Sequence, residues 1–376
     1  MALEKRVESP QKSGEIAQSL GMRQAILLLS RVWAWLFLLA LILVFTITTK
    51  IYQQVDFLTV RNSQNILVEI VPVLLMGLGQ TFVIIAGGID LSVGWVMGMA
   101  SVVSASVIVI LLPTGIGEGL SILLGFGAGL VSAMIPGFVN GLIIAKLRIP
   151  SFIVTLGMSF IARGIAYLIS GGNVVIGMPP GVRNFGNESM IYLLNGNIYF
   201  FQHPDATGIA LRSLDRVFTY PVVVAALVVG VAVFVLRRTR FGRHTYAIGG
   251  NAEAASRAGI RVDRHMIILY TLSGLTVGLA GILHTARFNG GSPIAGDPLL
   301  LSSIAAVIIG GVSMFGGHGN IVGTVIGALI IALLTTGLVM LNVQPFWQYV
   351  VVGVVVILAV LIDQGRDLII GRMKSE

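Results

Sequence analysis

The residues of this chain that could do chemistry are few, and their spacing excludes the common catalytic and metal sites. The histidines show no spacing typical of a zinc site; they are His203, His244, His265, His284 and His318. Gly311 and Gly316 imitate the start of a phosphate-binding loop, but Gly317 and His318 stand where that loop needs Lys and Ser or Thr. The sequence also contains no nucleophile elbow and no carboxylate pair spaced for acid–base catalysis. We therefore expect no enzyme activity, no cofactor and no metal ion.

A second group of polar and aromatic residues lies within or beside long apolar runs. Polar groups there are costly, and they usually face a cavity or a partner. Thr155, Ser159 and Arg163 recur every four residues, which places them on one face of a helix. We predict a substrate pathway lined by Asp90, Ser92, Trp95, Asn140, Phe152, Thr155, Ser159, Phe160 and Arg163.

These residues also have structural interpretations. Asp90 or Ser92 could cap the following helix by accepting its free N–H groups, and this role is compatible with a place in the pathway. Arg163 could form a salt bridge or lie at the outer membrane interface. The aromatic side chains could pack in the core or against lipid.

The composition places these residues in a membrane protein. Apolar residues make up 56% of the 376 residues, and charged residues make up 11%, whereas soluble domains carry about 25% charge. We therefore expect the basic residues behind the net charge of +8 to face anionic lipid and the cytoplasm, and not to bind nucleic acid. The absence of cysteine excludes disulfides. The first 24 residues have no apolar core, so we expect no removable signal peptide.

Ten apolar runs approach the length of about 20 residues that a helix needs to cross a bilayer. They are residues 32–49, 66–87, 92–112, 119–144, 151–170, 217–236, 266–286, 299–315, 321–341 and 345–362. Five pairs of glycines four residues apart would allow close helix packing: 94/98, 125/129, 137/141, 274/278 and 323/327. We predict an all-α polytopic membrane protein of about ten helices in a compact, Gly-rich bundle.

The distribution of Lys and Arg predicts that both termini are cytoplasmic. With this topology, 17 of the 24 basic residues lie inside and six lie outside. The domain boundaries are then a cytoplasmic segment 1–31, a transmembrane domain 32–363 and a cytoplasmic tail 364–376. Within the transmembrane domain, residues 171–216 form a long outer segment and residues 237–265 form a cytoplasmic loop.

The loop 237–265 contains seven of the basic residues and a short helix signal. Glu253-Ala254-Ala255 is followed after three residues by Gly259, so good helix formers precede a glycine stop. Glu253 lies near the start of this predicted helix and four residues before Arg257, which suits the helix dipole and an ion pair. Two interpretations remain open, a docking helix for a cytoplasmic partner and a solvated basic loop.

The spacing EAA-x-x-x-G resembles the coupling motif of permeases in ABC importers. The surrounding string FGRHTYAIGGNAEAASRAGIRV (241–262) is similar to monosaccharide permeases of the ribose, xylose, arabinose and galactose type. Four more strings resemble that family in the same order. They are GGIDLSVG (87–94), NGLIIAKLRIPSFIVTLGMSFIARGIAYLISGG (140–172), SSIAAVIIGGVSMFGGHGNIVGTVIGALI (302–330) and FWQYVVVGVVVILAVLID (346–363).

The resemblance implies a bacterial inner-membrane permease subunit that imports a pentose or hexose. Its partners would be a second permease copy, a cytoplasmic ATPase with two nucleotide-binding cassettes and a periplasmic sugar-binding protein. The implied ATPase-coupling residues are Gly242, Arg243, Glu253, Ala254, Ala255 and Gly259. Asn289 and Asp297, in an outer loop, are candidate contacts for the binding protein.

Two alternatives to sugar import remain. A permease of the same superfamily could carry inositol, a nucleoside, a branched-chain amino acid or a furanose signal. An ion- or proton-coupled carrier would need no ATPase, but it would need buried carboxylates as relays, and the chain offers chiefly Glu69 and Asp90.

Overall fold

The computed structural model describes residues 33–194, 196–201, 203–204, 214–355, 357–358 and 361. Within these residues, eight helices are long and apolar enough to cross a membrane. They are Trp33–Gln53, α2 (Val60–Ile85), α3 (Val93–Leu111), α4 (Glu118–Leu147), α5 (Ser151–Ser170), α7 (Tyr220–Arg238), α10 (Val262–Phe288) and α12 (Ile321–Met340). A 3-10 turn, η1 (Leu112–Thr114), extends α3. The predicted helical, multi-pass class is confirmed.

The two remaining predicted spans are shorter helices. The span predicted at 299–315 contains α11 (Leu300–Ile309), preceded by the 3-10 turn η3 (Asp297–Leu299). The span predicted at 345–362 contains the helix Pro345–Val355. The helix α11 ends early because Gly310 and Gly311 follow it. The predicted terminal segments 1–31 and 364–376 lie outside the described residues.

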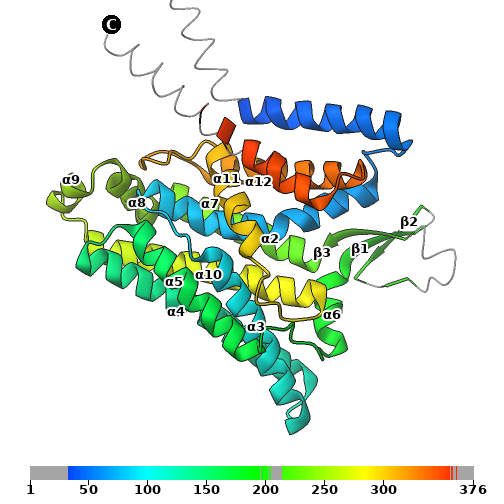
Figure 1. Ribbon diagram of the computed structural model, residues 1–376, viewed down its shortest axis with the longest axis horizontal. Coiled ribbons are helices and arrows are strands. Elements are labelled where there is room, and N and C mark those ends of the chain that lie inside the picture. The colour runs from blue at the N-terminus through cyan, green and yellow to red at the C-terminus, as the bar shows by residue number, and fades with distance from the viewer. Residues whose placement is uncertain are drawn as a thin grey trace, which may run out of the picture.

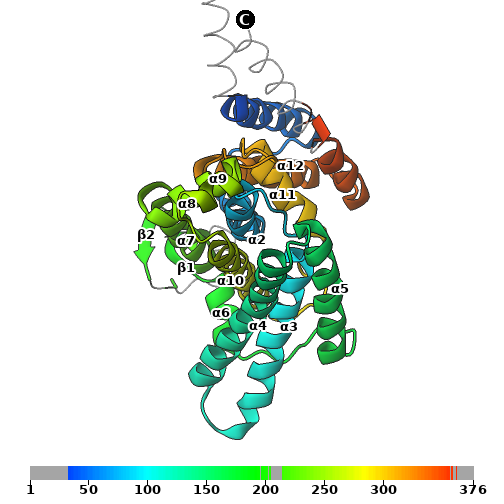
Figure 2. The same ribbon diagram turned by 90° about the vertical axis from the view of Figure 1, so that its left-hand side faces the viewer.

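The helix α2 lies at the centre of the bundle, with other helices around it (Figure 2). Its sequence is apolar on every side from Ile70 to Ile85, and nearly all of these residues are buried. A helix that is hydrophobic all round can be covered by neighbouring helices or by lipid, and the burial of α2 shows that helices cover it here.

The glycine pairs lie at helix contacts, as their spacing predicts. Gly137 and Gly141 of α4 face Tyr270 and Ile267 of α10, and a methyl group added at either glycine would overlap the opposing backbone. Of the other pairs, 125/129 lies against α3, 274/278 against α4, 323/327 against α11 and Gly310 at its end, and 94/98 against the loop residues Pro293 and Gly296 before η3. Close backbone approach is how membrane helices gain packing energy without a hydrophobic driving force.

The helices α2 and α11 end in the same way, at the two places where the sequence repeats Val-Ile-Ile before a glycine. In α2, Gly87 has φ +82° and Gly88 N–H donates to the Val83 carbonyl at 2.9 Å. In α11, Gly311 has φ +81° and Val312 N–H donates to the Val307 carbonyl at 3.2 Å. Both are glycine caps of the Schellman type. The sequence repeat therefore corresponds to a repeated local structure.

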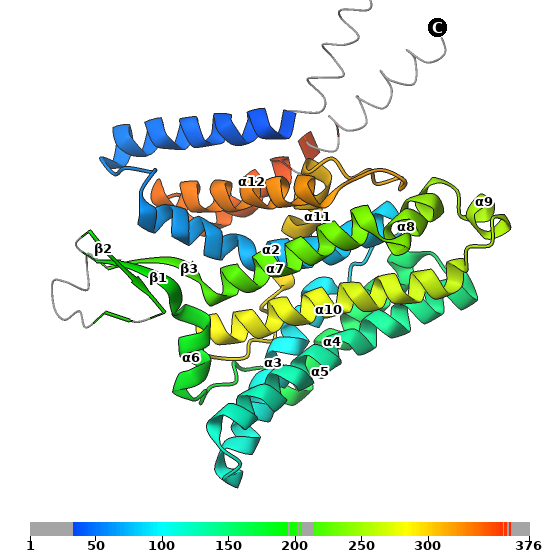
Figure 3. The ribbon, with the colours of Figure 1, turned by 180° about the vertical axis from the view of Figure 1, so that it is seen from behind.

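The two polar insertions lie at opposite ends of the bundle (Figure 1). One end carries α8 (Arg240–Gly250) and α9 (Ala252–Arg257). The other carries α6 (Pro180–Asn187) and an antiparallel sheet of order β2-β1-β3, formed by β1 (Ser189–Leu194), β2 (Asn197–Phe200) and β3 (Asp215–Thr219). The helix α10 runs between the two ends beside α4 (Figure 3). The predicted topology requires this separation, so we call these the inner and the outer end.

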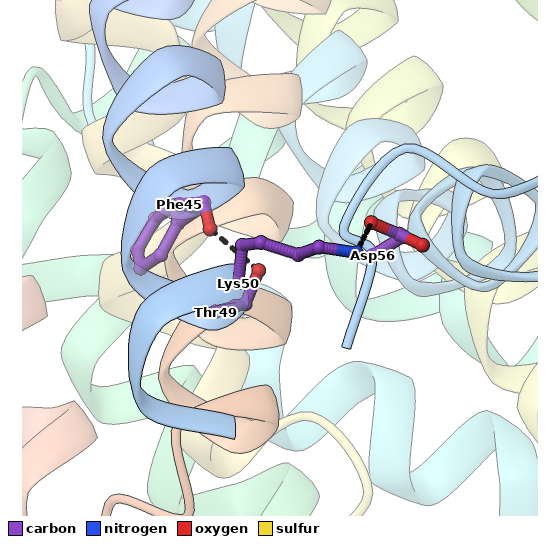
Figure 4. A network of polar contacts seen from close by, with 4 residues as sticks. All are labelled: Phe45, Thr49, Lys50 and Asp56. Carbon is purple, nitrogen blue, oxygen red and sulfur yellow. Dashed lines mark hydrogen bonds and ion pairs between the residues drawn. The ribbon is translucent and has the colours of Figure 1, made fainter. Parts of the chain in front are cut away.

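The turn between the first helix and α2 is held by polar contacts at the outer end (Figure 4). Lys50 Nζ lies 2.7 Å from Asp56 Oδ1, and both side chains are more than half exposed. Thr49 Oγ1 donates to the Phe45 carbonyl at 2.7 Å within the helix. An exposed ion pair of this kind contributes about 0–1 kcal/mol, so the contact orients the turn more than it stabilises the fold.

Candidate functional site

The predicted helix at residues 252–259 is present as α9, and both of its ends are capped. Asn251 Oδ1 accepts from Ala254 N–H at 2.8 Å at the start. At the end, Gly259 has φ +87°, its N–H donates to the Ser256 carbonyl at 3.0 Å, and Ile260 N–H donates to the Ala255 carbonyl at 3.1 Å. A glycine is favoured there because other residues rarely adopt this backbone conformation.

The surface of α9 is free on nearly every side. Ala255 is buried, and the other residues from Ala252 to Gly259 are exposed. Arg257 Nη2 lies 2.5 Å from Glu253 Oε1, which is the predicted ion pair. A short helix of small side chains with one neutralised charge pair offers a smooth, shallow surface to a protein partner. We call Ala252–Gly259, the segment predicted to couple to an ATPase, the coupling surface.

The helix α8 was not predicted, because residues 240–250 fall within the predicted cytoplasmic loop 237–265. Thr239 starts α8 by accepting from Gly242 N–H at 3.3 Å. Gly242 packs against the Leu236 backbone so closely that a methyl group would overlap it. Arg243 is exposed on α8. Glycine is therefore needed at position 242, where the chain turns from α7 into α8, because a side chain there would overlap Leu236.

At the end of α8, the backbone of Gly249 packs directly against the end of α2 and against the loop before α12. A methyl group added at Gly249 would overlap the Ile85 carbonyl of α2, and Gly317 N–H donates to that same carbonyl at 2.8 Å. Tyr246 Oη also donates to the Gly319 carbonyl at 2.7 Å. We call this contact of Gly249, Ile85 and Gly317 the glycine junction. The consecutive glycines at 249 and 250 are a local signal for this contact.

Beyond the glycine junction, Asp90 lies buried in the loop between α2 and α3. Its Oδ1 accepts from Ser92 N–H at 3.0 Å and Ser92 Oγ at 2.6 Å, and its Oδ2 accepts from Ser273 Oγ at 2.9 Å. Asn140 Nδ2 donates to Ser92 Oγ at 3.1 Å. The carboxylate thereby joins α3, α4 and α10. Neither Asp90 nor Ser92 caps the first turn of α3, because the N-cap residue Ser92 forms no side-chain cap hydrogen bond and, among the described residues, Asp90 accepts only from Ser92 itself and from Ser273. Sequence reasoning missed Ser273 because no local pattern pairs it with Asp90.

The same loop is bonded to α5. Ile89 N–H donates to Ser151 Oγ at 3.1 Å, and Leu91 N–H donates to Thr155 Oγ1 at 3.0 Å. A displacement of the loop therefore acts directly on the first turns of α5.

Trp95, Ser159, Phe160 and Arg163 meet at a cavity of about 360 Å³ between α3, α5 and the η3–α11 segment. The Arg163 guanidinium lies over the Trp95 ring, 4.6 Å from its centroid. Such a cation–π contact is worth about 0.5–1 kcal/mol at exposed sites. The Arg163 guanidinium, the Ser159 hydroxyl and the exposed Phe160 ring can offer hydrogen bonds and an apolar face to a small polar solute.

The remaining predicted residues lie elsewhere. Asp90, Ser92, Asn140 and Thr155 form the buried network rather than the cavity wall. Phe152 is exposed on α5 outside the cavity. Asn289 lies at the outer end of α10, and Asp297 lines the cavity as well as standing in the outer loop.

Replacing Asp90 with alanine is expected to lower the free energy of unfolding by about 2 kcal/mol or more. The buried Ser92 and Ser273 hydroxyls would lose their acceptor, and each unsatisfied group costs about 1–3 kcal/mol. Thermal unfolding of the purified chain in detergent measures the effect. Asp56→Ala is the control, since it removes an exposed carboxylate. Equal losses in the two variants would show that the Asp90 network does not stabilise the bundle.

Comparison with known proteins supports the resemblance found in the sequence. The model of the family described as branched-chain amino acid transport system, permease component, matches residues 62–360. A fructose import permease protein of Rhizobium meliloti is 38% identical over 308 residues, covering 82% of this chain and 79% of that protein. A ribose import permease protein of Escherichia coli (strain K12) is 36% identical over 338 residues, covering 89% and 96%. A D-allose transport system permease protein of the same strain is 35% identical over 308 residues, covering 82% and 85%. No solved structure matches the chain.

Proposed function

Because the chain belongs to the family of permease components of branched-chain amino acid transport systems, we propose that it is the membrane subunit of an ATP-driven importer for a monosaccharide. It is a multi-pass transport subunit and not an enzyme. The bacterial inner membrane is the location that fits this role. The observation that carries the proposal is the family match together with the capped, exposed α9.

The sugar substrate rests on the relatives. Although the family name refers to branched-chain amino acids, the relatives described above are named for fructose, ribose and D-allose. A cavity that combines Ser159, Phe160 and Arg163 suits a polyhydroxylated solute, which offers an apolar ring face and hydroxyl groups. The amino-acid, nucleoside, inositol and furanose-signal alternatives are not favoured.

ATP would be hydrolysed on a separate cytoplasmic chain, because this sequence has no complete phosphate-binding loop. Such an ATPase, with two nucleotide-binding cassettes, would dock on the coupling surface at the inner end. A periplasmic sugar-binding protein would approach the outer end, where Asn289 and Asp297 lie.

The pathway would be completed by a second copy of the chain. The cavity beside Arg163 is open on one side, and α5 exposes a row of apolar side chains next to it, including Phe152, Leu156 and Phe160. These side chains are at least 44% exposed in the single chain. Packing two such faces together would bury them and close the pathway between the copies.

The proposed cycle is alternating access. ATP binding moves α9, and the glycine junction passes the movement to the loop 86–92. Because that loop is bonded to Ser151 and Thr155, α5 moves with it and exposes the cavity to the outer end. Hydrolysis returns the cavity to the inner end. Weak binding in the cavity is expected, because the binding protein would supply the selectivity.

Reconstitution tests the proposal. The chain is placed in proteoliposomes with its cognate ATPase and binding protein, and uptake of labelled ribose, fructose and allose is measured. We expect uptake that requires ATP and the binding protein. Uptake driven by an ion gradient without ATP would instead support the carrier alternative. ATP-driven uptake of an amino acid but of no sugar would retain the importer and overturn the substrate.

A further inference from the structure

Glu69 is a carboxylate on a membrane-spanning helix that the transport pathway does not use. It lies nine residues into α2, about 13 Å from the start of the helix at a rise of 1.5 Å per residue. Its neighbours Val68 and Ile70 are buried, whereas Glu69 is exposed on the side of α2 that faces a cavity. Among the described residues, Glu69 forms neither a salt bridge nor a side-chain hydrogen bond. An ionisable group at such a position is expensive unless it has a partner.

The cavity beside Glu69 has a volume of about 800 Å³ and lies at the outer end between α2, α10, α11, α12 and the helix Pro345–Val355. No residue of α5 lines it, so it is distinct from the cavity beside Arg163, although Asp297 lines both. A smaller adjoining cavity of about 160 Å³ shares Glu69, Arg287, Pro298 and Leu299 with it. We call the two together the outer lateral cavity. Its volume falls in the range of about 300–1,000 Å³ that small-molecule sites occupy.

The lining of the outer lateral cavity combines polar and apolar side chains. The polar part includes Asn65, Glu69, Arg287, Asp297 and Gln348. The apolar part includes Leu299, Leu301, Val339 and Val352. Two of these apolar side chains, Leu301 and Val339, are 65% and 58% exposed. Since they belong to membrane helices, the apolar part opens sideways towards lipid rather than towards water.

Three charged residues line the cavity, Glu69, Asp297 and Arg287, and among the described residues no salt bridge joins Arg287 to either carboxylate. The Glu69 carboxylate lies close enough to Arg287 for their charges to interact, but the pair is not among the salt bridges of the described residues. The side chain of His284, which lines the smaller cavity, has a buried Nδ1 without a hydrogen-bond partner. A ligand that fits these groups carries an anion and a cation a few atoms apart, and a long apolar tail.

We propose that the outer lateral cavity binds one phospholipid of the outer leaflet whose headgroup ends in a primary ammonium. Arg287 binds its phosphate, Glu69 accepts hydrogen bonds from its ammonium, and one acyl chain lies against Leu299, Leu301 and Val352. Charge-assisted hydrogen bonds of this kind are the strongest available to the headgroup. The proposal depends on the membrane topology and not on which solute is transported.

The test compares two lipids that differ only in the ammonium. The full-length chain is delipidated in detergent and titrated with phosphatidylethanolamine or with phosphatidylcholine of the same acyl chains, whose trimethylated nitrogen has no N–H donor. Native mass spectrometry counts the bound lipid, and thermal unfolding reports its effect. We expect one phosphatidylethanolamine per chain, bound about tenfold more tightly than phosphatidylcholine, because the hydrogen bonds to a charged partner are lost. Equal binding of the two lipids by the wild-type chain would overturn the proposal without any variant.

Two variants test the roles proposed for the Glu69 carboxylate and the Arg287 guanidinium. Glu69→Gln is expected to bind the two lipids equally, and Arg287→Gln is expected to weaken both. Asp56→Asn, which alters an exposed carboxylate at the same end of the bundle, should keep the preference for phosphatidylethanolamine. A Glu69→Gln chain that keeps the tenfold preference contradicts the assignment. Displacement of the lipid by ribose, or its loss when two copies of the chain associate, would show that a sugar or a second copy is the occupant.

Discussion

Replacing Gly249 with alanine is expected to reduce ATP-driven uptake at least tenfold, although the change adds one methyl group. That methyl group would overlap the Ile85 carbonyl and reach within 2.5 Å of the Gly317 N–H. The two groups are hydrogen-bonded to each other at 2.8 Å, so neither can yield without breaking the bond. Overpacking of this kind costs about 1–3 kcal/mol. The end of α8 must therefore move away from α2, and α8 no longer connects the coupling surface to the loop 86–92.

The neighbouring glycine supplies a matched control for this prediction. Gly250 also belongs to α8, but a methyl group there would meet nothing within 4 Å. Gly250→Ala is expected to leave uptake and thermal unfolding unchanged. Uptake and ATPase activity of both variants are measured in proteoliposomes with the partner proteins. If Gly249→Ala transports as well as Gly250→Ala, then the glycine junction does not carry movement between α9 and α5.

The local features of this protein could be predicted from the sequence because they depend on neighbouring residues. The helix α9 needs a residue that caps its start, good helix formers and a glycine after its end, and all of these lie within Asn251–Gly259. The ion pair of Glu253 with Arg257 follows from the helical repeat alone. Glycine spacing likewise predicted which helix faces pack, although not which helices they meet.

The site could not be predicted where residues distant in the sequence meet. Asp90 was correctly singled out as a costly buried carboxylate, but its hydrogen bond to Ser273 joins residues 183 positions apart. The glycine junction brings together residues from α2, α8 and the loop before α12, and nothing in any one segment indicates the others. The helix α11 was expected to be a full span because Val312, Met314 and Phe315 continue the apolar run, whereas Gly310 and Gly311 end the helix. Apolar composition indicates that the segment is buried, but the helix ends where Gly311 adopts φ +81°.

Replacing Gly259 with proline is expected to abolish the coupling of ATP hydrolysis to uptake while the chain still inserts into the membrane. Gly259 has φ +87°, and its N–H donates to the Ser256 carbonyl. Proline fixes φ near −65° and has no N–H, so the variant loses both the turn and the bond that end α9. Because the Glu253–Arg257 pair and the exposed face of the helix depend on that cap, the coupling surface loses its shape. We expect uptake to fall at least tenfold, with the detergent-solubilised chain recovered in normal amounts.

Asparagine at the same position separates the backbone requirement from the loss of glycine itself. Asparagine tolerates positive φ better than other side chains, and a Cβ atom at residue 259 meets nothing within 4 Å. Gly259→Asn is therefore expected to keep most of the uptake that Gly259→Pro loses. Both variants replace the same exposed glycine. A difference between their uptake rates therefore reports how far transport depends on the positive-φ cap of α9. Full uptake by Gly259→Pro would show that α9 does not transmit energy from the ATPase, and equal loss in both variants would show that glycine is needed for contact with the partner rather than for the cap.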